Sequence, residues 1–452
     1  MSAPPEVTRT LAAFTAETSG VKIPAPIRHE VSRSVVNWMG CALGGASHET
    51  LDAALATFKL FSTAPQCTVI GRKERTDCPT AALLNGMSAH VLDFDDTHSG
   101  TLLHPSVPVA SSLLALAEFL GQSGGKLRGD RFVEAFVIGA DVECRIAKGI
   151  YRQHIERAYI TGTAGVFGAA AAVGRVLGLD ADRMAQAFGL AGTQAAGLRA
   201  MAGTMAKSFI HGRAAQNGLL AALMAQAGFT ASRNVIEAPR GFVDALIDEF
   251  DFSIMLDGLG ERWELGANTY KPHACGVVAH PVIDICMEAR NRHGVQPAQV
   301  ATLALQVHPL ALKLTGIQAP RGGLESKWSL FHSAAAVLID GEAGEAQYTD
   351  ARVNDPQVLA LRGRVTATAD AALGEDEARG VLTLVDGREL KLHVSHALGS
   401  LGNPMGDRDL DRKLKSLAGG RLPAARLALL IDECWKVGQL DDVARLPRLA
   451  AL

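Results

Sequence analysis

A change in hydrophobic pattern near residue 266 divides this chain and limits the folds that it can adopt. Before that point, segments rich in Ala and Leu repeat with helical spacing between breaks marked by Gly. After it, residues 301–310 alternate between apolar and polar positions, and residues 380–394 form two alternating runs joined by Asp386-Gly387, which predicts a β-hairpin. The predicted helices are 27–44, 108–121, 130–149, 163–178, 212–227, 281–292, 329–340, 407–417 and 422–436.

These patterns predict a mainly α protein with two domains. A large all-helical domain comprises residues 1–266 and 405–452, and a smaller α+β lid domain comprises residues 267–404. Only 5% of the residues are aromatic and 46 are Gly, a composition that suits closely packed helices better than a β-sandwich or barrel. The length of 452 residues also exceeds what one compact core usually holds.

The charge and cysteine content exclude several classes of partner and site. With 44 Lys and Arg against 47 Asp and Glu, the net charge is −3, so we expect neither nucleic acid nor membrane as a partner. The seven cysteines contain no CxxC pair, which argues against a disulfide framework or a zinc ribbon. No basic start with an apolar block opens the sequence, and the best candidate for a bilayer span, around 105–117, contains two prolines. We therefore expect a cytoplasmic protein.

The densest group of reactive side chains lies in HVLDFDDTHSGTLLHPS, residues 90–106. Three carboxylates within four residues repel one another, which is tolerated where they cap a helix or bind a ligand. Histidine and aspartate also ligate metals, but the spacing matches no common metal motif. We therefore predict acid–base chemistry and no metal. The polar members of the group are His90, Asp93, Asp95, Asp96, Thr97, His98 and His104.

Three later segments carry further candidates. Residues 201–218 place Lys207 and His211 among small and apolar residues, residues 268–284 contain Lys271 and His273, and residues 326–341 contain His332. Taken singly, each is as readily explained as a solvated lysine or an ordinary core histidine. Together they flank the predicted domain boundary, and clefts between domains are favoured sites for small molecules.

The chain resembles the MmgE/PrpD family, which includes 2-methylcitrate dehydratase, cis-aconitate decarboxylase and iminodisuccinate epimerase. The resemblance is carried, in order, by GMSAHVLDFDDTH, HPS, TGTAGVFGAAAAVGRVLGL, the Lys207 segment, KPHACGVVAHP, SKWSLFHSAAAVLIDG and NPM, and it covers nearly the whole chain. It implies a helical domain built from both chain ends, an inserted α+β lid, a homodimer, and chemistry without metal or cofactor.

The resemblance also implies an active site between the two domains. Matched position by position, it places Asp93, Thr97, His104 and Lys207 there, with Lys271 and its neighbours contributing from the lid side. We predict that the catalytic residues are Asp93, His104, Lys207 and Tyr159, and that the substrate-binding residues are Thr97, Lys271, His273 and His332. Four positions depart from the usual family pattern: Tyr159 replaces a histidine, His273 an aromatic residue, Val277 an arginine, and His332 a tyrosine.

The predicted function is a cofactor-independent lyase whose partner is a small di- or tricarboxylate. It would act through a carbanion stabilised by a neighbouring carboxylate, with dehydration like that of 2-methylcitrate dehydratase first and decarboxylation of a cis-aconitate-like acid next. The alternatives are an epimerase or isomerase of a dicarboxylate such as iminodisuccinate, and a non-catalytic carboxylate-binding homologue.

Overall fold

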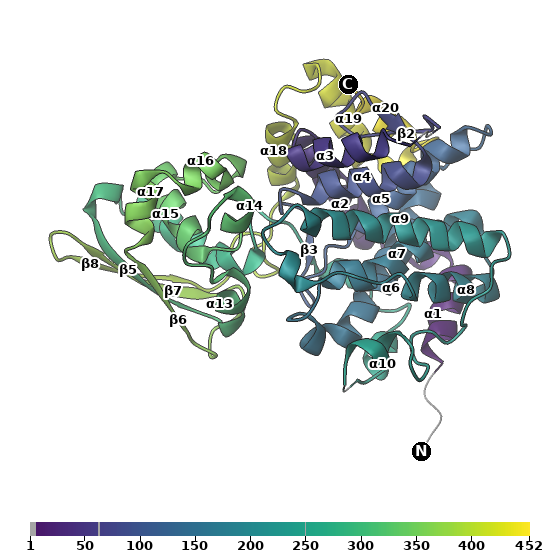
Figure 1. Cartoon of the computed structure of the whole chain (residues 1–452), viewed down its shortest axis with the longest axis horizontal. Helices are drawn as coiled ribbons and strands as arrows, with labels where there is room; N and C mark the ends of the chain where they lie inside the picture. Colours follow the sequence, from purple (N-terminus) through teal and green to yellow (C-terminus); the bar gives the residue numbers. More distant parts are fainter. Residues whose placement is uncertain (1–5, 62–63, 249) are drawn as a thin grey trace.

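The computed structural model describes residues 6–61, 64–248 and 250–452. Figure 1 shows two lobes: a large helical one that holds both ends of the chain, and a small one that carries a sheet. The mainly α fold with a smaller α+β part is therefore confirmed. The exact boundary between the two domains stays a prediction.

The large domain is built from the N-terminal helices and the C-terminal helices together. The predicted helices before residue 266 and after residue 405 are all present, while α1, α3, α4, α8 and the short helices α10, α11 and α20 were not predicted. The helices are α1 Val7–Glu17, α2 Ala25–Gly45, α3 Glu49–Phe58, α4 Cys78–His90, α5 Ser106–Gly121, α6 Gly129–His154, α7 Ile160–Leu177, α8 Ala181–Gly192, α9 Ala206–Gln226, α10 Phe242–Leu246, α11 Ser253–Leu256, α18 Asp407–Ala418, α19 Ala424–Trp435 and α20 Arg445–Leu449.

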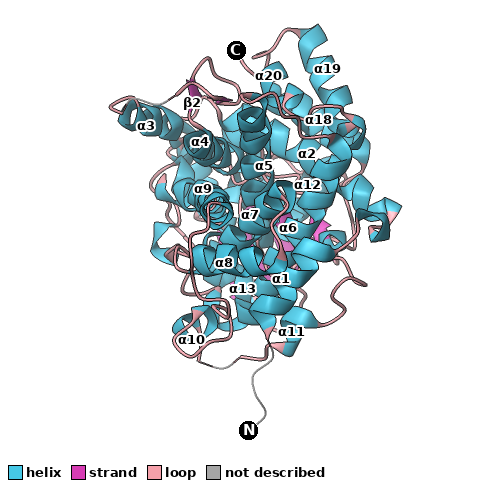
Figure 2. Ribbon diagram, turned by 90° about the vertical axis from the view of Figure 1, so that its right-hand side faces the viewer, coloured by secondary structure: helices cyan, strands magenta, loops and turns pink. Residues whose placement is uncertain are grey.

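Helix α7 lies at the centre of this domain, with α5, α6, α8 and α9 packed around it (Figure 2). By length and composition it is the one helix among the described residues that is apolar enough to cross a membrane, and 83% of it is buried inside the protein. The sequence had instead pointed to residues 105–117 as the best candidate. Burial on all sides explains why α7 is apolar throughout, as expected for the core helix of a large helical domain.

Helices α4 and α9 cross at a pair of glycines. A Cβ added to Gly86 would lie 2.8 Å from the Cα of Gly212, closer than carbon atoms tolerate. The absence of side chains here lets the two backbones touch. As a result, the last residue of α4, His90, lies beside the first turns of α9, which carry Lys207 and His211.

The small domain, defined here as α12–α17 with β5–β8, contains a four-stranded sheet in the order β6-β5-β7-β8. Strand β5 is parallel to β6 and antiparallel to β7, and β7 and β8 form the predicted hairpin, with Gly387 at φ +85°. Strand β6 was not predicted. The elements are α12 His280–Asn291, β5 Val300–Val307, α13 Pro309–Thr315, α14 Gly323–Ser326, α15 Leu330–Asp340, α16 Asp350–Val353, α17 Pro356–Arg362, β6 Val365–Ala369, β7 Ala378–Leu384 and β8 Glu389–Val394.

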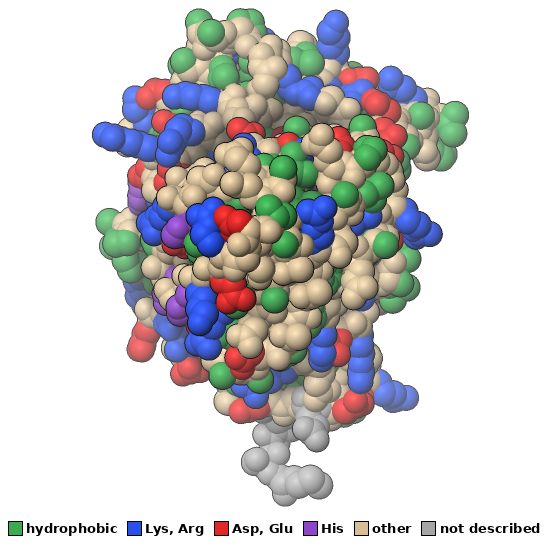
Figure 3. Space-filling view, turned by 90° about the vertical axis from the view of Figure 1, so that its left-hand side faces the viewer, with side chains coloured by type: hydrophobic (Ala, Val, Ile, Leu, Met, Phe, Trp, Pro, Cys, Tyr) green, Lys and Arg blue, Asp and Glu red, His purple; other side chains and the backbone are tan. Residues whose placement is uncertain are grey.

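Helices α12 and α15 cover one face of this sheet (Figure 1). Burial alternates along β7, so its other face is open. Figure 3 shows the end of the molecule that the small domain forms, where Lys and Arg are intermixed with Asp and Glu. This surface carries no block of one sign, in keeping with the near-neutral net charge of the chain.

Two short sheets depart from the prediction of an all-helical large domain. Strands β1 (Cys67–Thr68) and β2 (Arg75–Thr76) pair near α4. Strands β3 (Thr97–His98) and β4 (Asn268–Thr269) also pair, with Thr97 opposite Thr269. The second pair ties the acidic segment after α4 to the chain that enters the small domain, so it fixes the junction where the candidate site lies.

Candidate active site

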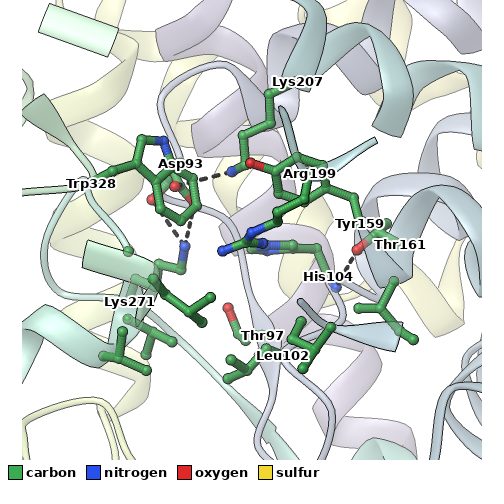
Figure 4. Close-up of a pocket in the computed structure, with 16 residues that line it drawn as sticks. Asp93, Thr97, Leu102, His104, Tyr159, Thr161, Arg199, Lys207, Lys271 and Trp328 are labelled. Carbon is green, nitrogen blue, oxygen red and sulfur yellow. Dashed lines mark hydrogen bonds and ion pairs between the residues drawn. The ribbon is translucent and has the colours of Figure 1, made fainter. Parts of the chain in front are cut away.

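A pocket lies at the junction of the two domains (Figure 4). Both domains contribute residues, and the polar side chains come from loops and helix ends. The large domain supplies Asp93, Thr97, Leu102, His104, Ile155, Tyr159, Ile160, Thr161, Arg199 and Lys207; the other side of the pocket is formed by Lys271, Gly276, Val277, Val278, Leu314 and Trp328.

Asp93 is held between two lysines at the edge of the pocket. Its Oδ1 lies 2.5 Å from Nζ of Lys271, and its Oδ2 lies 3.1 Å from Nζ of Lys207 (Figure 4). The Lys271 contact is a hydrogen bond, whereas the Lys207 ammonium is at ion-pair distance without a hydrogen-bond partner among the described residues. Lys207 therefore keeps its N–H groups available for a ligand.

Asp93 also has an unusual backbone conformation. Its φ is +52°, a left-handed value that non-glycine residues rarely adopt, and Leu102 on another wall of the pocket has φ +55°. Conformations of this kind persist where the surroundings hold them, and they concentrate at functional sites. Here the two lysines supply the contacts that hold Asp93.

The three charges shift one another's pKa. Burial alone would raise the pKa of Asp93, but Lys207 and Lys271 outweigh it and hold that pKa well below its ordinary value. Burial lowers the pKa of Lys207 to about 8, against the opposing effect of Asp93. Burial would also lower the pKa of Lys271, but Asp93 and Asp95 reverse the shift and raise it. Asp93 is therefore a fixed negative charge and a weak base, and Lys207 is a cation that titrates near pH 8.

His104 faces the pocket with one ring nitrogen fixed by the protein. Its Nδ1 lies 2.9 Å from the carbonyl oxygen of Asp96, which can only accept, so Nδ1 carries the proton. Oδ2 of Asp95 is 3.2 Å from the same nitrogen, and the backbone N–H of His104 donates to the Thr161 hydroxyl at 3.0 Å. The remaining nitrogen, Nε2, is left to accept a proton from a ligand.

Two more histidines stand behind His104. Nδ1 of His90 lies 2.9 Å from Oδ2 of Asp95, and burial lowers the pKa of His90 to about 3 although Asp95 opposes the shift. His211 bonds through Nδ1 to the Lys207 carbonyl oxygen at 2.7 Å, and burial holds its pKa well below the ordinary value. Both rings are therefore neutral near pH 7.

Two groups of side chains in the described residues bring possible metal ligands close together: His90, His104 and His211, and His90 with Asp93, Asp95 and His104. The rings of His90 and His211 stack, however, with centroids 3.5 Å apart and planes only 12° apart. A single ion would lie out of the plane of at least one of these rings, whereas nitrogen ligands bind metals in the ring plane. This geometry argues against a metal held by the three histidines. In the second group, Asp93 is already paired with Lys207 and Lys271, and Asp95 lies beside His90 and His104.

Two buried hydroxyls in the pocket lack partners among the described residues: Oγ1 of Thr97 and Oη of Tyr159. Buried polar groups are normally hydrogen-bonded, so such groups at a pocket wall are available to a ligand. Burial raises the pKa of the Tyr159 phenol, with Arg199 opposing the shift, and the phenol therefore stays protonated at neutral pH.

The structure brings together six of the eight residues predicted for the site. Their roles in catalysis or binding stay predictions, but all six line the one pocket: Asp93, Thr97, His104, Tyr159, Lys207 and Lys271. The other two lie elsewhere. His273 is 3.4 Å from Asp284 and lines a separate cavity. His332 lies inside the small domain, where Nε2 donates to the Gln347 carbonyl oxygen at 2.7 Å.

We therefore correct the expected placement of His273 and His332, which do not contact this pocket. The physical reason is the direction of their side chains. His273 turns to the far side of its loop, toward α12, and the helix of His332 points that ring at a backbone carbonyl. Conversely, several residues that line the pocket were not predicted from the sequence, among them Arg199 and Trp328. Arg199 is the one charged residue in the loop 193–205. That is the only feature of the sequence that could have indicated a role for it.

Comparisons with known proteins agree with this description. Residues 9–255 match the MmgE/PrpD N-terminal domain, and residues 273–437 match the MmgE/PrpD C-terminal domain. The cis-aconitate decarboxylase of Aspergillus terreus is 25% identical over 94% of this chain and 92% of its own. The cis-aconitate decarboxylase of Mus musculus is 27% identical over 92% and 88%, and the 2-methylcitrate dehydratase of Cupriavidus necator is 24% identical over 78% and 76%.

Decarboxylation and dehydration are both lyase reactions, so the predicted enzyme class is confirmed at that level. The two family domains together span nearly the whole chain, and the pocket lies at their junction. The chain belongs to the MmgE/PrpD family.

Proposed function

We propose that this protein is a lyase that removes a small neutral molecule from a polycarboxylate, through a carbanion next to a carboxylate. One observation carries the proposal: two buried lysines share a single aspartate at a pocket wall that also offers unpartnered hydroxyl groups. Fixed cations and donors in a water-poor site stabilise the negative charge that spreads into a carboxylate when its neighbouring carbon loses a proton.

In this proposal, Lys207, Lys271 and Thr97 bind the carboxylate next to the reacting carbon. His104 is the base, because Nδ1 is engaged by the Asp96 carbonyl and leaves Nε2 to take the proton. Asp93 is unsuited to that role, since its pKa is held well below the ordinary value. Its part is to position the two lysines and to limit the net positive charge.

Dehydration is the outcome that we place first. The carbon–hydrogen electron pair forms the double bond, the carbon–oxygen bond breaks, and the departing hydroxide takes a proton from the Tyr159 phenol to leave as water. The guanidinium of Arg199 lies 4.7 Å and Nζ of Lys207 5.6 Å from the centre of the phenol ring, where they stabilise the phenolate that forms. The proton on His104 then returns to the phenolate through water.

Decarboxylation is the second candidate, favoured by the names of the relatives that align along most of the chain. The same cations would then stabilise the carbanion left by the electron pair of the broken carbon–carbon bond after CO2 departs. His104, protonated on both ring nitrogens at the outset, would donate its Nε2 proton to carbon and would then regain a proton from solvent. The apolar residues of the pocket are compatible with this outcome, because a carboxylate placed against them is poorly solvated.

The test is a product analysis on a panel of hydroxylated and unsaturated di- and tricarboxylates, including 2-methylcitrate and cis-aconitate. Absorbance of a new conjugated double bond reports dehydration, and released CO2 reports decarboxylation. We expect Lys207→Ala and His104→Ala each to lower turnover by at least about 10²-fold with unchanged circular dichroism. Lys415→Ala, which changes an exposed lysine on α18, should leave turnover intact. Full turnover by both pocket variants would refute the proposed site.

Two other results would replace the proposed reaction. Deuterium from heavy water that enters recovered substrate without loss of water or CO2 would identify an epimerase or isomerase. Tight binding without turnover across the panel would identify a non-catalytic carboxylate-binding protein.

A further inference from the structure

Arg199 enters the pocket from a short helical turn, Arg199–Met201, between α8 and α9. Its Cζ lies 4.7 Å from the centre of the Tyr159 ring and 5.2 Å from that of Trp328. Figure 4 shows the side chain reaching between these residues toward the centre of the pocket, across from Lys271. Two aromatic rings packed on a guanidinium restrict its position. Its N–H groups lie at the rim of the guanidinium plane, where they can still donate hydrogen bonds to a ligand.

Backbone contacts fix the turn from which Arg199 extends. The N–H of Tyr159 donates to the carbonyl of Gly197 at 3.0 Å, and the N–H of Arg199 donates to the carbonyl of Arg157 at 3.1 Å. The same loop meets the small domain, because a Cβ on Gly203 would lie 3.0 Å from the Cα of Glu325. Arg199 is therefore held by a loop that is anchored on both sides of the junction.

The guanidinium of Arg199 has no carboxylate within ion-pair distance in the part of the chain that the structure describes. Three cationic side chains, Arg199, Lys207 and Lys271, line the pocket together with one carboxylate, Asp93. Three positive charges and one negative charge leave two positive charges. Two ligand carboxylates would balance them.

Six apolar side chains also line the pocket and are called here the apolar wall, and a third carboxylate placed against them has no cation to meet. They are Leu102, Ile155, Ile160, Val277, Val278 and Leu314. An uncompensated charge placed against such a wall loses its hydration and gains no partner, which is strongly unfavourable, whereas a methyl group gains from burial.

We propose that Arg199 is a second carboxylate-binding site, and that the preferred ligand is a dicarboxylate with a small apolar substituent. This inference rests on the proposed function, in which Lys207 and Lys271 bind the first carboxylate. Arg199 binds the remote one by a bidentate pair of hydrogen bonds, and the substituent lies on the apolar wall. Arg199 thereby sets substrate specificity, and it neither gives nor takes a proton itself.

The test uses three inert ligands that differ by one group each: methylsuccinate, 2-methylbutyrate, which lacks the remote carboxylate, and propane-1,2,3-tricarboxylate, which adds one to the methyl group. Binding to the full-length protein is measured by isothermal titration calorimetry. The variants are Arg199→Gln, Arg199→Lys, and the control Arg213→Gln, which changes an exposed arginine of α9 outside the pocket.

We expect the wild type to bind methylsuccinate more tightly than either other ligand. Arg199→Gln should weaken methylsuccinate binding about 10- to 100-fold and leave 2-methylbutyrate binding unchanged, since hydrogen bonds between charged groups are worth that much. Arg199→Lys should recover part of the loss, and Arg213→Gln should match the wild type. A misfolded variant would bind both ligands more weakly, so the loss of methylsuccinate binding alone would distinguish the proposed role from misfolding.

Three results would overturn the inference: no binding of methylsuccinate by the wild type, equal weakening of both ligands by Arg199→Gln, or tighter binding of the tricarboxylate than of methylsuccinate. None of the ligands turns over, so the outcome is independent of catalysis. The expected binding pattern in a protein without lyase activity would refute the proposed function alone, and an active enzyme whose binding ignores Arg199 would refute this inference alone.

Discussion

Two pairs of buried lysines meet at the domain junction, and they serve different purposes. Lys207 and Lys271 face the pocket and share the carboxylate of Asp93. Lys327 and Lys413 lie behind it and point at backbone carbonyls: Lys327 donates to Leu92 and Ala274 at 2.8 and 2.7 Å. Lys413 donates to the carbonyls of Phe94 and Lys271 at 2.5 and 2.8 Å, and to the side chain of Asn37 at 2.7 Å.

The difference shows that burial of a lysine does not by itself indicate a functional site. Burial lowers the pKa of Lys207, Lys327 and Lys413 alike to about 8. What separates them is the partner: the lysines behind the pocket satisfy main-chain acceptors and join loops of the two domains, whereas Lys207 has no hydrogen-bond partner among the described residues. An incompletely satisfied ammonium beside a cavity is the feature that points to a ligand.

Of the changes considered, replacement of Lys207 by Met should have the largest effect, which is a loss of catalytic activity. We expect kcat/KM to fall by about 10²- to 10³-fold, the usual loss when one fixed donor to a developing anion is removed. The free energy of unfolding should change little, because Asp93 keeps its bond to Lys271. Steady-state kinetics and urea denaturation measure the two quantities, with Lys415→Met as the exposed control. If the activity of Lys207→Met stays within tenfold of the wild type, Lys207 has no functional role that separates it from the lysines behind the pocket.

Replacement of Lys413 by Met should lower the stability of the protein. It leaves buried acceptors without a donor, and we expect the free energy of unfolding to fall by about 3 kcal/mol. Urea denaturation followed by circular dichroism measures the loss. An unchanged denaturation midpoint would show that Lys413 does not join the domains as its contacts indicate.

The pH dependence should isolate Lys207. Its pKa of about 8 means that the ammonium is present below pH 8 and is lost above it, so kcat/KM should fall about tenfold per pH unit on the alkaline side. An arginine in this position keeps its positive charge above pH 8. In Lys207→Arg the fall of kcat/KM should therefore occur at higher pH, even if the maximal value of kcat/KM is lower. A decline that stays near pH 8 in the arginine variant would assign it to another group.

The smallest expected effect comes from adding a cation to the apolar wall. Val277→Arg should improve the binding of propane-1,2,3-tricarboxylate relative to methylsuccinate by up to about tenfold, because the third carboxylate gains a partner at the edge of the pocket. Calorimetry with both ligands measures the ratio, and Arg213→Gln again serves as the control. An unchanged ratio would mean that the wall at Val277 does not face the ligand.

Much of the fold could be predicted because its elements carry local signals. The helices with one polar face, such as α6, and the hairpin at Asp386-Gly387 follow from periodicity and turn chemistry. Helix α4 was missed because all but one of its residues are buried, which removes the alternation that marks an amphipathic helix. Strand β6 was missed because five residues of Val, Thr and Ala are too short a pattern, and its identity depends on pairing with β5.

The candidate site divides in the same way. Asp93, His104 and Lys207 could be found because reactive residue types cluster in the chain or stand among apolar neighbours. Arg199 could not, since its direction depends on backbone bonds between two loops and on rings from both domains. His332 was placed at the site in error, because residue type alone does not tell which way a helix turns its side chain.

The pairing of Thr97 with Thr269 has a mechanical consequence. Strand β4, which leads into the small domain, pairs with strand β3, and β3 lies in the acidic loop between Asp93 and His104. A shift of one lobe against the other would therefore displace this loop, and with it the distance between Asp93, which positions the two lysines, and His104, the proposed base.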